Sequence, residues 1–324
     1  MSAGTDTIEV RITDVNAAAD DIRVFWLART DGAALPAYAP GSHIDVHLPI
    51  GLVRQYSLCG ADASAPEYRI AVKREPASRG GSAWLHSAAQ VGTQMRIGTP
   101  RNAFALSDTA DQHLLIAGGI GVTPILSMAC ALAASRRRYT LAYFARSDTS
   151  VVFRTEFEGS PLADQARIHA GLSSAATREC IIGLLSAALP NTHLYVCGPP
   201  AFMEMTVGLA RDMLGEQFVH QESFGPALPV PGDEREFSVR LEGRSDAIPV
   251  PAGKTVLASL REAGLDIPSS CEVGVCGTCM MRVLAGEPDH RDTYLTDDER
   301  AAGTCFLPCV SRSHSSVLVL DELA

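Results

Sequence analysis

This 324-residue chain lacks several features, and each absence excludes a class of protein. No apolar run reaches the length of about 18 residues that a membrane-spanning helix needs. Residues 1–6 are small and polar, without the apolar core of a signal peptide after them. The net charge of −10 at pH 7 opposes binding to nucleic acid. We therefore expect a protein of the cytoplasm that binds neither membrane nor nucleic acid.

Familiar catalytic arrangements are also missing. The nine histidines are scattered, with no catalytic triad and no cluster of metal-ligating histidines. The nine cysteines, an odd number, fit a reducing compartment better than a disulfide framework. The length predicts two or three domains, and 46% hydrophobic with 20% charged residues is typical of a globular protein.

A group of cysteines near the C-terminus predicts an iron–sulfur site. Cys271, Cys276 and Cys279 follow the C-x4-C-x2-C spacing of a plant-type [2Fe–2S] cluster, which needs one more thiolate downstream. Cys305 and Cys309 both lie downstream, and the spacing does not decide between them. The alternative is a zinc knuckle, but such sites usually have two C-x2-C pairs and the chain has no second pair. A [2Fe–2S] cluster is therefore the favoured metal site.

Residues 8–104 alternate apolar and polar side chains in short runs separated by turn residues. This pattern predicts antiparallel strands that form a small β-barrel, with one helix after Ser82. The expected strands are Ile8–Val15, Ile22–Leu27, His43–Leu48, Gln55–Leu58, Arg69–Val72 and Met95–Ile97.

Two parts of this barrel are suited to a phosphate-bearing cofactor. One strand carries Arg54 and Tyr56 on one face and Ser57 on the other. Lys73 precedes the loop Ser78–Ser82, whose glycines would expose backbone N–H groups at a helix start, where a phosphate fits. A diglycine alone is also typical of a plain turn, but the Arg-x-Tyr-Ser strand favours the phosphate site.

Residues 113–224 alternate strands with helices, which predicts a parallel α/β domain with its ligand site at the carboxyl ends of the strands. Strands are expected at His113–Ala117, Thr140–Ala145, Arg167–Ala170, His193–Cys197 and Phe218–His220, and helices near Pro124–Ala134, Cys180–Leu189 and Ala201–Leu214.

Two glycine-containing loops follow strands of this domain. Gly118–Pro124 follows the first strand, and Cys197–Pro200 follows the fourth. Both would let a dinucleotide approach bare backbone, although a glycine loop can also serve only close strand–helix packing. Two such loops at one predicted cleft favour a dinucleotide site.

A linker and a third domain complete the chain. Three prolines and two glycines within Gly225–Gly232 predict a semi-rigid spacer. A hairpin, a helix, the cysteine loop and a last strand follow, in the order of a β-grasp ferredoxin. The hairpin is expected at Glu236–Leu241 with Ala247–Val250, the helix at Thr255–Ala263 and the last strand at Val317–Asp321. The expected domains are a β-barrel at 1–108, a dinucleotide-binding α/β domain at 109–225, a linker at 226–234 and a ferredoxin domain at 235–324.

The motifs stand in a fixed order: Arg54-x-Tyr56-Ser57 with Gly80-Gly81-Ser82, then the two glycine loops, then the cysteine loop. In this order the chain resembles the phthalate dioxygenase reductase family, which includes vanillate O-demethylase reductase components, over nearly its whole length. The position of the ferredoxin domain at the end distinguishes this family from relatives that carry ferredoxin first. The resemblance implies an FMN-containing, NADH-dependent oxidoreductase that delivers electrons to an oxygenase.

The resemblance also implies roles for individual residues. The FMN site would contain Arg54, Tyr56, Ser57, Lys73, Gly80, Gly81 and Ser82, to which the glycine loop adds Arg79. The pyridine-nucleotide cleft would contain Gly118, Gly119, Thr123, Cys197 and Gly198, and the fourth cluster ligand would be Cys309. Phe224 would cover the flavin face, which makes it and Cys197 the candidate catalytic residues. The alternatives are a core phenylalanine at a domain boundary and a small buried apolar residue.

The electron count explains why these sites occur together. A nicotinamide gives two electrons at once as a hydride, a [2Fe–2S] cluster accepts one, and a flavin can do both, so it belongs between them. The resemblance favours FMN over FAD and NADH over NADPH. Arg146 would suit the 2′-phosphate of NADPH, whereas Asp148 nearby would oppose it or bind ribose hydroxyls.

We expect the reductase component of a two-component Rieske-type aromatic oxygenase or O-demethylase, in the catabolism of aromatic compounds. The alternatives are a reductase for a cytochrome P450 or another monooxygenase and, from another class, a flavin and iron–sulfur redox sensor or electron-carrier module. Residues 233–324 carry 16 acidic and 9 basic residues, either a face that steers a redox partner or a merely solvated surface. The aromatic substrate would bind to the partner oxygenase and not to this chain.

Overall fold

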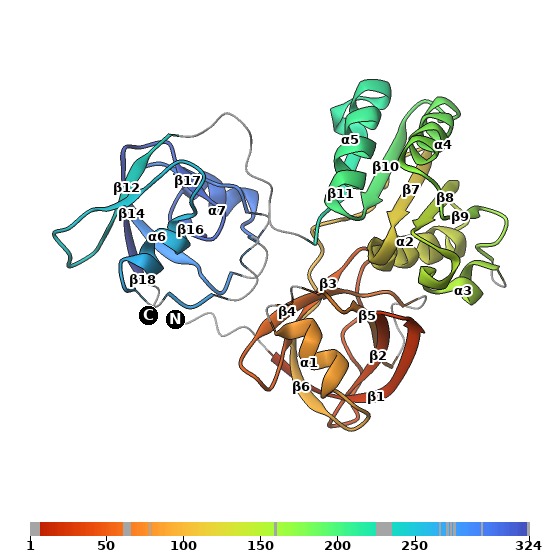
Figure 1. The fold of residues 1–324 in the computed structure, drawn as a ribbon, viewed down its shortest axis with the longest axis horizontal. Helices are drawn as coiled ribbons and strands as arrows, with labels where there is room; N and C mark the ends of the chain where they lie inside the picture. Colours follow the sequence, from red (N-terminus) through yellow and green to blue (C-terminus); the bar gives the residue numbers. More distant parts are fainter. Residues whose placement is uncertain are drawn as a thin grey trace. The chain divides into compact units, whose positions relative to one another are not determined.

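The computed structural model divides into two compact units, residues 1–224 and 225–324 (Figure 1). It describes residues 7–60, 66–76, 78, 80–158, 161–224, 235–265, 267–269, 272, 274, 277–292 and 294–322. The expected linker at 226–234 lies outside these residues, as do Arg79, Cys271 and Cys276.

The first half of unit 1 is an antiparallel barrel, as its alternating pattern predicts. The sheet order is β4-β3-β6-β1-β2-β5, and a bridge between Leu58 and Ile70 brings β4 next to β5. Alternate side chains such as Ile44 and Val46 fill its core. The elements are β1 (Thr7–Ala19), β2 (Ile22–Arg29), β3 (His43–His47), β4 (Val53–Ser57), β5 (Tyr68–Lys73), α1 (Gly81–Ser87) and β6 (Gln94–Gly98).

The second half of unit 1 is a five-stranded parallel sheet of order β11-β10-β7-β8-β9, covered by α2 on one face and by α4 and α5 on the other (Figure 1). Its strands are β7 (Gln112–Gly118), β8 (Tyr139–Ala145), β9 (Ala166–Ala170), β10 (Thr192–Cys197) and β11 (Val219–Glu222). Its helices are α2 (Val122–Ala134), α3 (Arg154–Glu158), α4 (Ser174–Ser186) and α5 (Pro200–Leu214), with short 3₁₀ turns at Gly119–Gly121, Asp148–Ser150 and Glu216–Phe218.

One of these helices starts earlier than the sequence pattern predicts. The expected helix at Cys180–Leu189 is α4, which begins at Ser174 because the Ser173 hydroxyl caps the Ala176 N–H. It ends at Ser186, ahead of Pro190. The expected existence of this helix is confirmed, and its expected bounds are wrong.

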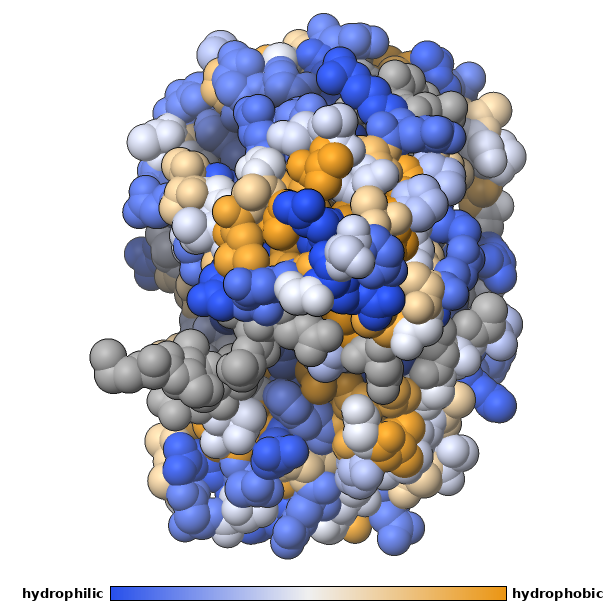
Figure 2. Space-filling model, turned by 90° about the vertical axis from the view of Figure 1, so that its left-hand side faces the viewer, coloured by the Kyte–Doolittle hydropathy of each residue, from blue (hydrophilic) through white to orange (hydrophobic). Residues whose placement is uncertain are grey.

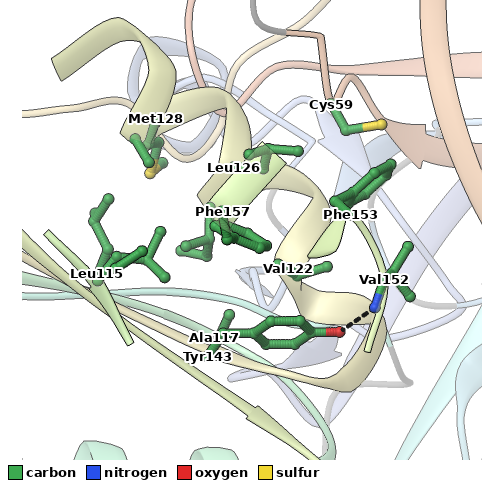
Figure 3. Close-up of a cluster of buried hydrophobic side chains, with 14 of the residues drawn as sticks. Cys59, Leu115, Ala117, Val122, Leu126, Met128, Tyr143, Val152, Phe153 and Phe157 are labelled. Carbon is green, nitrogen blue, oxygen red and sulfur yellow. Dashed lines mark hydrogen bonds between the residues drawn. The ribbon is translucent and has the colours of Figure 1, made fainter. Parts of the chain in front are cut away.

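A single hydrophobic cluster joins the two halves of unit 1. In Figure 3, Cys59 of the barrel lies beside α2 and beside Phe153, which belongs to the half of unit 1 that contains the parallel sheet. The Tyr143 hydroxyl accepts a hydrogen bond from the Val152 N–H at 3.2 Å in the same cluster. At its edge Arg69 of β5 pairs with Glu156 of α3 at 2.8 Å and lies over the Phe153 ring. The barrel and the parallel sheet therefore form one packed body.

Unit 2 is a mixed sheet with a packed helix, the expected β-grasp arrangement. The sheet order is β13-β12-β18-β14-β16; β12 and β18 are parallel and the other pairs antiparallel. α6 packs on it through Val256, Leu257 and Leu260. The elements are β12 (Phe237–Leu241), β13 (Ile248–Val250), α6 (Val256–Glu262), β14 (Met281–Ala285), β15 (Pro288–Asp289), α7 (Asp297–Ala302), β16 (Cys305–Phe306), β17 (Arg312–Ser313) and β18 (Val317–Glu322).

The surface carries few large apolar side chains. In Figure 2 hydrophilic residues cover most of the face shown, and hydrophobic residues gather in small patches between them. Within the part of the chain that the structure describes, no helix is long and apolar enough to cross a membrane.

Candidate functional site

Three functional side chains meet where the barrel faces the carboxyl edge of the parallel sheet. Cys197 ends β10, and Glu222 ends β11 directly beside it in the parallel ladder. Ser57, at the end of β4, donates a hydrogen bond from its hydroxyl to the Glu222 carboxylate at 3.4 Å. This contact joins residues 165 positions apart, one in each half of unit 1. The three side chains thus form a small polar site at the junction.

Burial controls the protonation of this site. Burial raises the pKa of the half-buried Glu222 carboxyl to about 8, and the hydrogen bond from Ser57 offsets part of this rise. Burial, and secondly the nearby Glu222, raise the pKa of the Cys197 thiol well above its ordinary value. Cys197 is therefore a neutral thiol, and Glu222 is a carboxyl group that can hold a proton at neutral pH.

Sequence analysis did not single out Glu222. The available signal was its place just after the expected strand Phe218–His220 and two residues before Phe224, whereas its position beside Cys197 is seen only in the structure. A carboxylate at the carboxyl edge of a parallel sheet lies where ligands bind. Phe224 itself is 46% exposed, so it is not the core phenylalanine that was the alternative interpretation.

The two glycine loops of the parallel sheet lie against each other. A methyl group on Gly121 would overlap the Cys197 carbonyl, and one on Gly198 would lie 2.7 Å from the Phe202 ring. Gly118 is equally tight against Phe202, at 2.9 Å. These glycines therefore serve close packing, which is what the plain-packing alternative required.

Gly119 differs from its neighbours in the same loop. It has a φ of +53° and no atom within 4 Å of the position a side chain would take. Its backbone therefore faces open space at the carboxyl end of β7, where a dinucleotide can approach. Thr123 follows in the first turn of α2, and its hydroxyl donates to the Ile120 carbonyl at 3.1 Å.

The barrel motifs that were predicted to hold a phosphate also meet. A methyl group on Gly81 would lie 2.6 Å from Cγ of Arg54, so the β4 arginine crosses the start of α1. The Ser82 hydroxyl donates to Ser78 Oγ at 3.0 Å and accepts from the Glu75 N–H at 3.2 Å. Gly80 has a φ of +96°, a conformation that favours glycine. Gly80 and Gly81 have no side chains to cover the backbone beside Arg54, so these residues fit a phosphate group.

The other predicted cofactor residues are more exposed. Lys73 pairs with the exposed Glu75 at 3.3 Å. Arg146 is exposed at the end of β8, and Asp148 beyond it pairs with Arg154 at 3.0 Å. Tyr56 is half-buried at the edge of the barrel core.

In unit 2 the two described cysteines that were predicted as cluster ligands share one core. Cys279 and Cys309 are both 3% exposed and belong to the same hydrophobic cluster. Cys305 is half-buried in β16, where it pairs with Arg282 of β14. Two buried thiols from distant parts of the chain in one core cluster are compatible with a thiolate-ligated metal centre.

The loop between the predicted ligands needs its glycines. Gly274 and Gly277 have φ values of +75° and +71°. A methyl group on Gly274 would lie 2.5 Å from Val310, and one on Gly277 would overlap the Tyr294 ring. The buried Asp292 carboxylate accepts from the Tyr294 and Leu295 N–H groups at 3.2 and 2.9 Å. Asp292 and Tyr294, which sequence analysis missed, thus support this loop.

Comparison with known proteins agrees with this geometry. An oxidoreductase NAD-binding domain model matches residues 115–208, and a 2Fe-2S iron-sulfur cluster binding domain model matches residues 239–314. The chain is 43% identical to a vanillate O-demethylase oxidoreductase of Pseudomonas sp. over 97% of this chain and 99% of that protein.

Solved structures give the same result over the whole chain. A structure of phthalate dioxygenase reductase, described as a modular structure for electron transfer from pyridine nucleotides to [2Fe–2S], is 36% identical with a TM-score of 0.70 and covers 97% of this chain and 98% of its own. An intact type IV self-sufficient cytochrome P450 monooxygenase is 34% identical with a TM-score of 0.78, over 97% of this chain and 41% of its own. The protein is an oxidoreductase with an NAD-binding and a [2Fe–2S] domain, and it belongs to the phthalate dioxygenase reductase family.

Proposed function

We propose that the protein is the reductase component of a two-component Rieske-type aromatic oxygenase or O-demethylase. It would pass electrons from NADH through FMN to a [2Fe–2S] cluster and then to the oxygenase. The observation that carries this proposal is the full-length similarity to vanillate O-demethylase oxidoreductase, with the NAD-binding and cluster-binding domains in one chain.

FMN supplies a carrier that takes up two electrons at once and releases them singly. The chain would bind its phosphate with Arg54 and the loop at 78–82, because the arginine side chain lies directly against Gly81 at the start of α1. Tyr56 and the exposed Phe224 would pack against the ring. The full proposed set is Arg54, Tyr56, Ser57, Lys73, Arg79, Gly80, Gly81, Ser82 and Phe224.

NADH would lie across the carboxyl edge of the parallel sheet. The open backbone at Gly119 supports this position, because a pyrophosphate needs close access to N–H groups. The proposed nucleotide set is Gly118, Gly119, Thr123, Arg146, Cys197 and Gly198. The family resemblance favours NADH over NADPH, and Asp148 near Arg146 is already paired with Arg154.

The polar site at the junction would manage one proton. Oxidation of NADH by one-electron acceptors releases one proton for each pair of electrons. Glu222, with a pKa raised to about 8, can hold that proton, and Ser57 can relay it through its hydroxyl. Cys197, as a neutral buried thiol, would act as a small packing surface for the nicotinamide.

We further propose Cys271, Cys276, Cys279 and Cys309 as the cluster ligands. The functional segments would be an FMN-binding barrel at 1–108, an NAD-binding domain at 109–225, a linker at 226–234 and a ferredoxin domain at 235–324. A cytoplasmic location is consistent with the free thiols of Cys59, Cys130, Cys180 and Cys197.

A second candidate partner is a cytochrome P450. A self-sufficient P450 monooxygenase is similar over 97% of this chain, which corresponds to 41% of the P450 protein. That protein therefore contains a comparable module together with other segments, and this favours a P450 as the partner. A sensor or carrier is less well supported, because the full-length relatives are oxidoreductases and the chain contains an NAD-binding domain.

Reconstitution would test the proposal. The purified protein would be mixed with NADH and either a vanillate-type Rieske oxygenase with an aromatic acid or a P450 with its substrate. We expect product in proportion to NADH consumed only with the Rieske oxygenase. Coupled turnover only with the P450 would favour the second candidate, and NADH oxidation without product in both would contradict the proposed role.

A further inference from the structure

The amino-terminal edge of the parallel sheet has a groove that the proposed electron path does not use. A cavity of about 540 Å³ opens there, and a smaller one of about 70 Å³ adjoins it. Gln112 of β7 and Thr140 of β8 line both cavities, so the two form one continuous groove. In Figure 1 the strands of the sheet run toward the barrel, so the groove lies where the strands begin, and the polar site at Cys197 and Glu222 lies where they end.

One side of the larger cavity is basic. Three consecutive arginines, Arg136, Arg137 and Arg138, line it in the turn between α2 and β8. Arg137 has a structural role, because it donates to the Ser107 and Asp108 carbonyls at 2.9 and 3.2 Å and pairs with the exposed Asp108 carboxylate at 3.4 Å. Arg136 and Arg138 are exposed and have no hydrogen bond or ion pair within the described part of the chain. These two guanidinium groups are therefore available to an anion.

Gln112 and Thr140 add uncharged polar groups to the groove. The side-chain oxygen of Gln112 accepts from the Leu189 N–H and from the Thr192 hydroxyl, both at 3.1 Å. Because the oxygen is engaged, the amide NH₂ group of Gln112 is left as a donor. Among the described residues that line the two cavities, none is acidic. The groove thus offers positive charge and donors, without a lining carboxylate that would repel an anion.

The smaller cavity is largely apolar. Leu114, Leu184, Ala187 and Ala188 line it, together with Thr192 and the two residues that it shares with the larger cavity. An apolar cavity of about 150 Å³ can hold benzene, so the smaller cavity has room for a short alkyl group and not for a ring. The groove is therefore basic at one end and apolar at the other.

We propose that this groove is a second ligand site, which binds a small organic carboxylate. Its carboxylate would lie against Arg136 and Arg138, since a guanidinium group can donate two parallel hydrogen bonds to a carboxylate. A short apolar group of the same ligand would enter the cavity beside Leu184 and Ala188, where it leaves water. An inorganic anion would use only the basic end, and a neutral molecule only the apolar end. The groove contains no residue of the proposed NADH, FMN or cluster sites, so this site does not depend on the proposed function.

The test measures the dissociation constants of small probes by ligand-observed NMR titration of the full-length protein with its cofactors bound. The probe is 4-ethylbenzoate, which combines a carboxylate with a short alkyl group. Its amide, 4-ethylbenzamide, has the same shape without the charge, and inorganic phosphate has charge without an apolar part. We expect saturable binding of 4-ethylbenzoate with a Kd on the order of 1 mM or tighter. Both comparison compounds should compete for the site roughly tenfold more weakly.

Variants assign the binding to the groove. Arg136→Gln with Arg138→Gln removes both charges and keeps most of the apolar stems, and it should weaken 4-ethylbenzoate binding roughly tenfold. Ala188→Leu fills the smaller cavity and should weaken binding roughly fivefold. Arg178→Gln is the matched control, because Arg178 is an exposed arginine of α4 that lines neither cavity, and it should leave the Kd unchanged. Reduction of a dye by NADH should be the same in all these variants.

Binding of the amide as tight as that of the carboxylate, an unchanged Kd in the double arginine variant, or equal weakening by Arg178→Gln would each overturn the proposal. If Ala188→Leu does not fold, benzoate tests the apolar end in the wild-type protein. Benzoate lacks the ethyl group and should bind several-fold more weakly, and equal affinity would refute the proposal. Saturating NAD⁺ should leave the binding of 4-ethylbenzoate unchanged, because a dinucleotide binds at the opposite edge of the sheet. Displacement by NAD⁺ would assign the probe to the dinucleotide cleft and would also refute the second site.

Discussion

Glu222 illustrates how one position in the fold determines the behaviour of a side chain. An ordinary glutamate is ionised at pH 7, but burial raises its pKa to about 8, so it is mostly protonated there. The site therefore has a group whose charge changes near pH 8. This change of charge gives a measurable pH dependence.

We predict that the rate of FMN reduction by NADH in the wild type falls as pH rises above about 8, with a slope approaching about tenfold per pH unit. The reason is that only protonated Glu222 can supply, through Ser57, the proton that FMN takes up together with the hydride. Glu222→Gln keeps the shape of the protonated carboxyl but cannot ionise, so its rate should be flat through the same range. Anaerobic stopped-flow measurement of flavin bleaching at a series of pH values checks this. A variant profile with the wild-type inflection would assign the pH dependence to another group.

The fourth cluster ligand is also decided at a single residue. Cys309 is 3% exposed in the same core cluster as Cys279, whereas Cys305 is half-buried in β16. We expect Cys309→Ser to lose most of the [2Fe–2S] absorbance and the acid-labile sulfide. Cys305→Ser should keep both, with a small loss of stability. The reverse result would make Cys305 the ligand.

At the scale of elements, the cysteine loop depends on glycine for two separable reasons. Gly277 has a φ of +71°, and a methyl group there would overlap the Tyr294 ring. Gly243, in the turn between β12 and β13, has a φ of +77° but no atom within 4 Å of that position. The two positions share the backbone strain and differ in the steric overlap.

We predict that Gly243→Ala destabilises unit 2 by about 1 kcal/mol through the left-handed backbone alone. Gly277→Ala should cost roughly 2–5 kcal/mol, because overpacking against Tyr294 adds to the same strain. Thermal unfolding of the full chain, followed by the visible absorbance of the cluster, measures both. Equal losses in the two variants would show that Tyr294 does not constrain the loop.

The barrel strands and the parallel sheet were predictable because burial leaves a pattern in the sequence. A strand buried on one face alternates apolar and polar residues, and a strand buried on both faces is a continuous apolar run. Alternation at His43–Leu48 and the apolar run at His193–Cys197 both reappear as β3 and β10 with nearly the same bounds. α4 started early because a serine cap outweighed the apolar pattern. α3, α7, β14 and the two-residue strands were not predicted, since elements of two to six residues depend on tertiary contacts more than on local pattern.

The site was only partly predictable for a related reason. Arg54, Ser57 and Cys197 were found because each stands in a local motif. The Ser57–Glu222 hydrogen bond joins residues 165 positions apart, and no local motif carries that information. His43 was placed in a strand, but its burial depends on other segments of the chain, so no local pattern could predict it.

At the scale of the whole molecule, the chain consists of two units with different tasks. In unit 1 one hydrophobic cluster is shared by the barrel and the parallel sheet, reinforced by the Arg69–Glu156 pair. Unit 2 has its own core around α6 and the cysteine loop. A body with its own core can fold independently, so the two tasks should be separable by cutting between them.

We predict that a chain ending at Phe224 binds FMN and reduces a dye with NADH at a rate close to that of the full protein. It should not support the oxygenase, because the cluster-bearing unit is absent. Full-length Cys309→Ser is the matched control: it should show the same loss of oxygenase turnover with unit 2 still attached. Adding residues 235–324 as a separate protein should restore little turnover, because separation removes the high effective concentration that a linker gives. If the chain ending at Phe224 drove the oxygenase at the full rate, electrons would leave from the flavin and unit 2 would not be their exit.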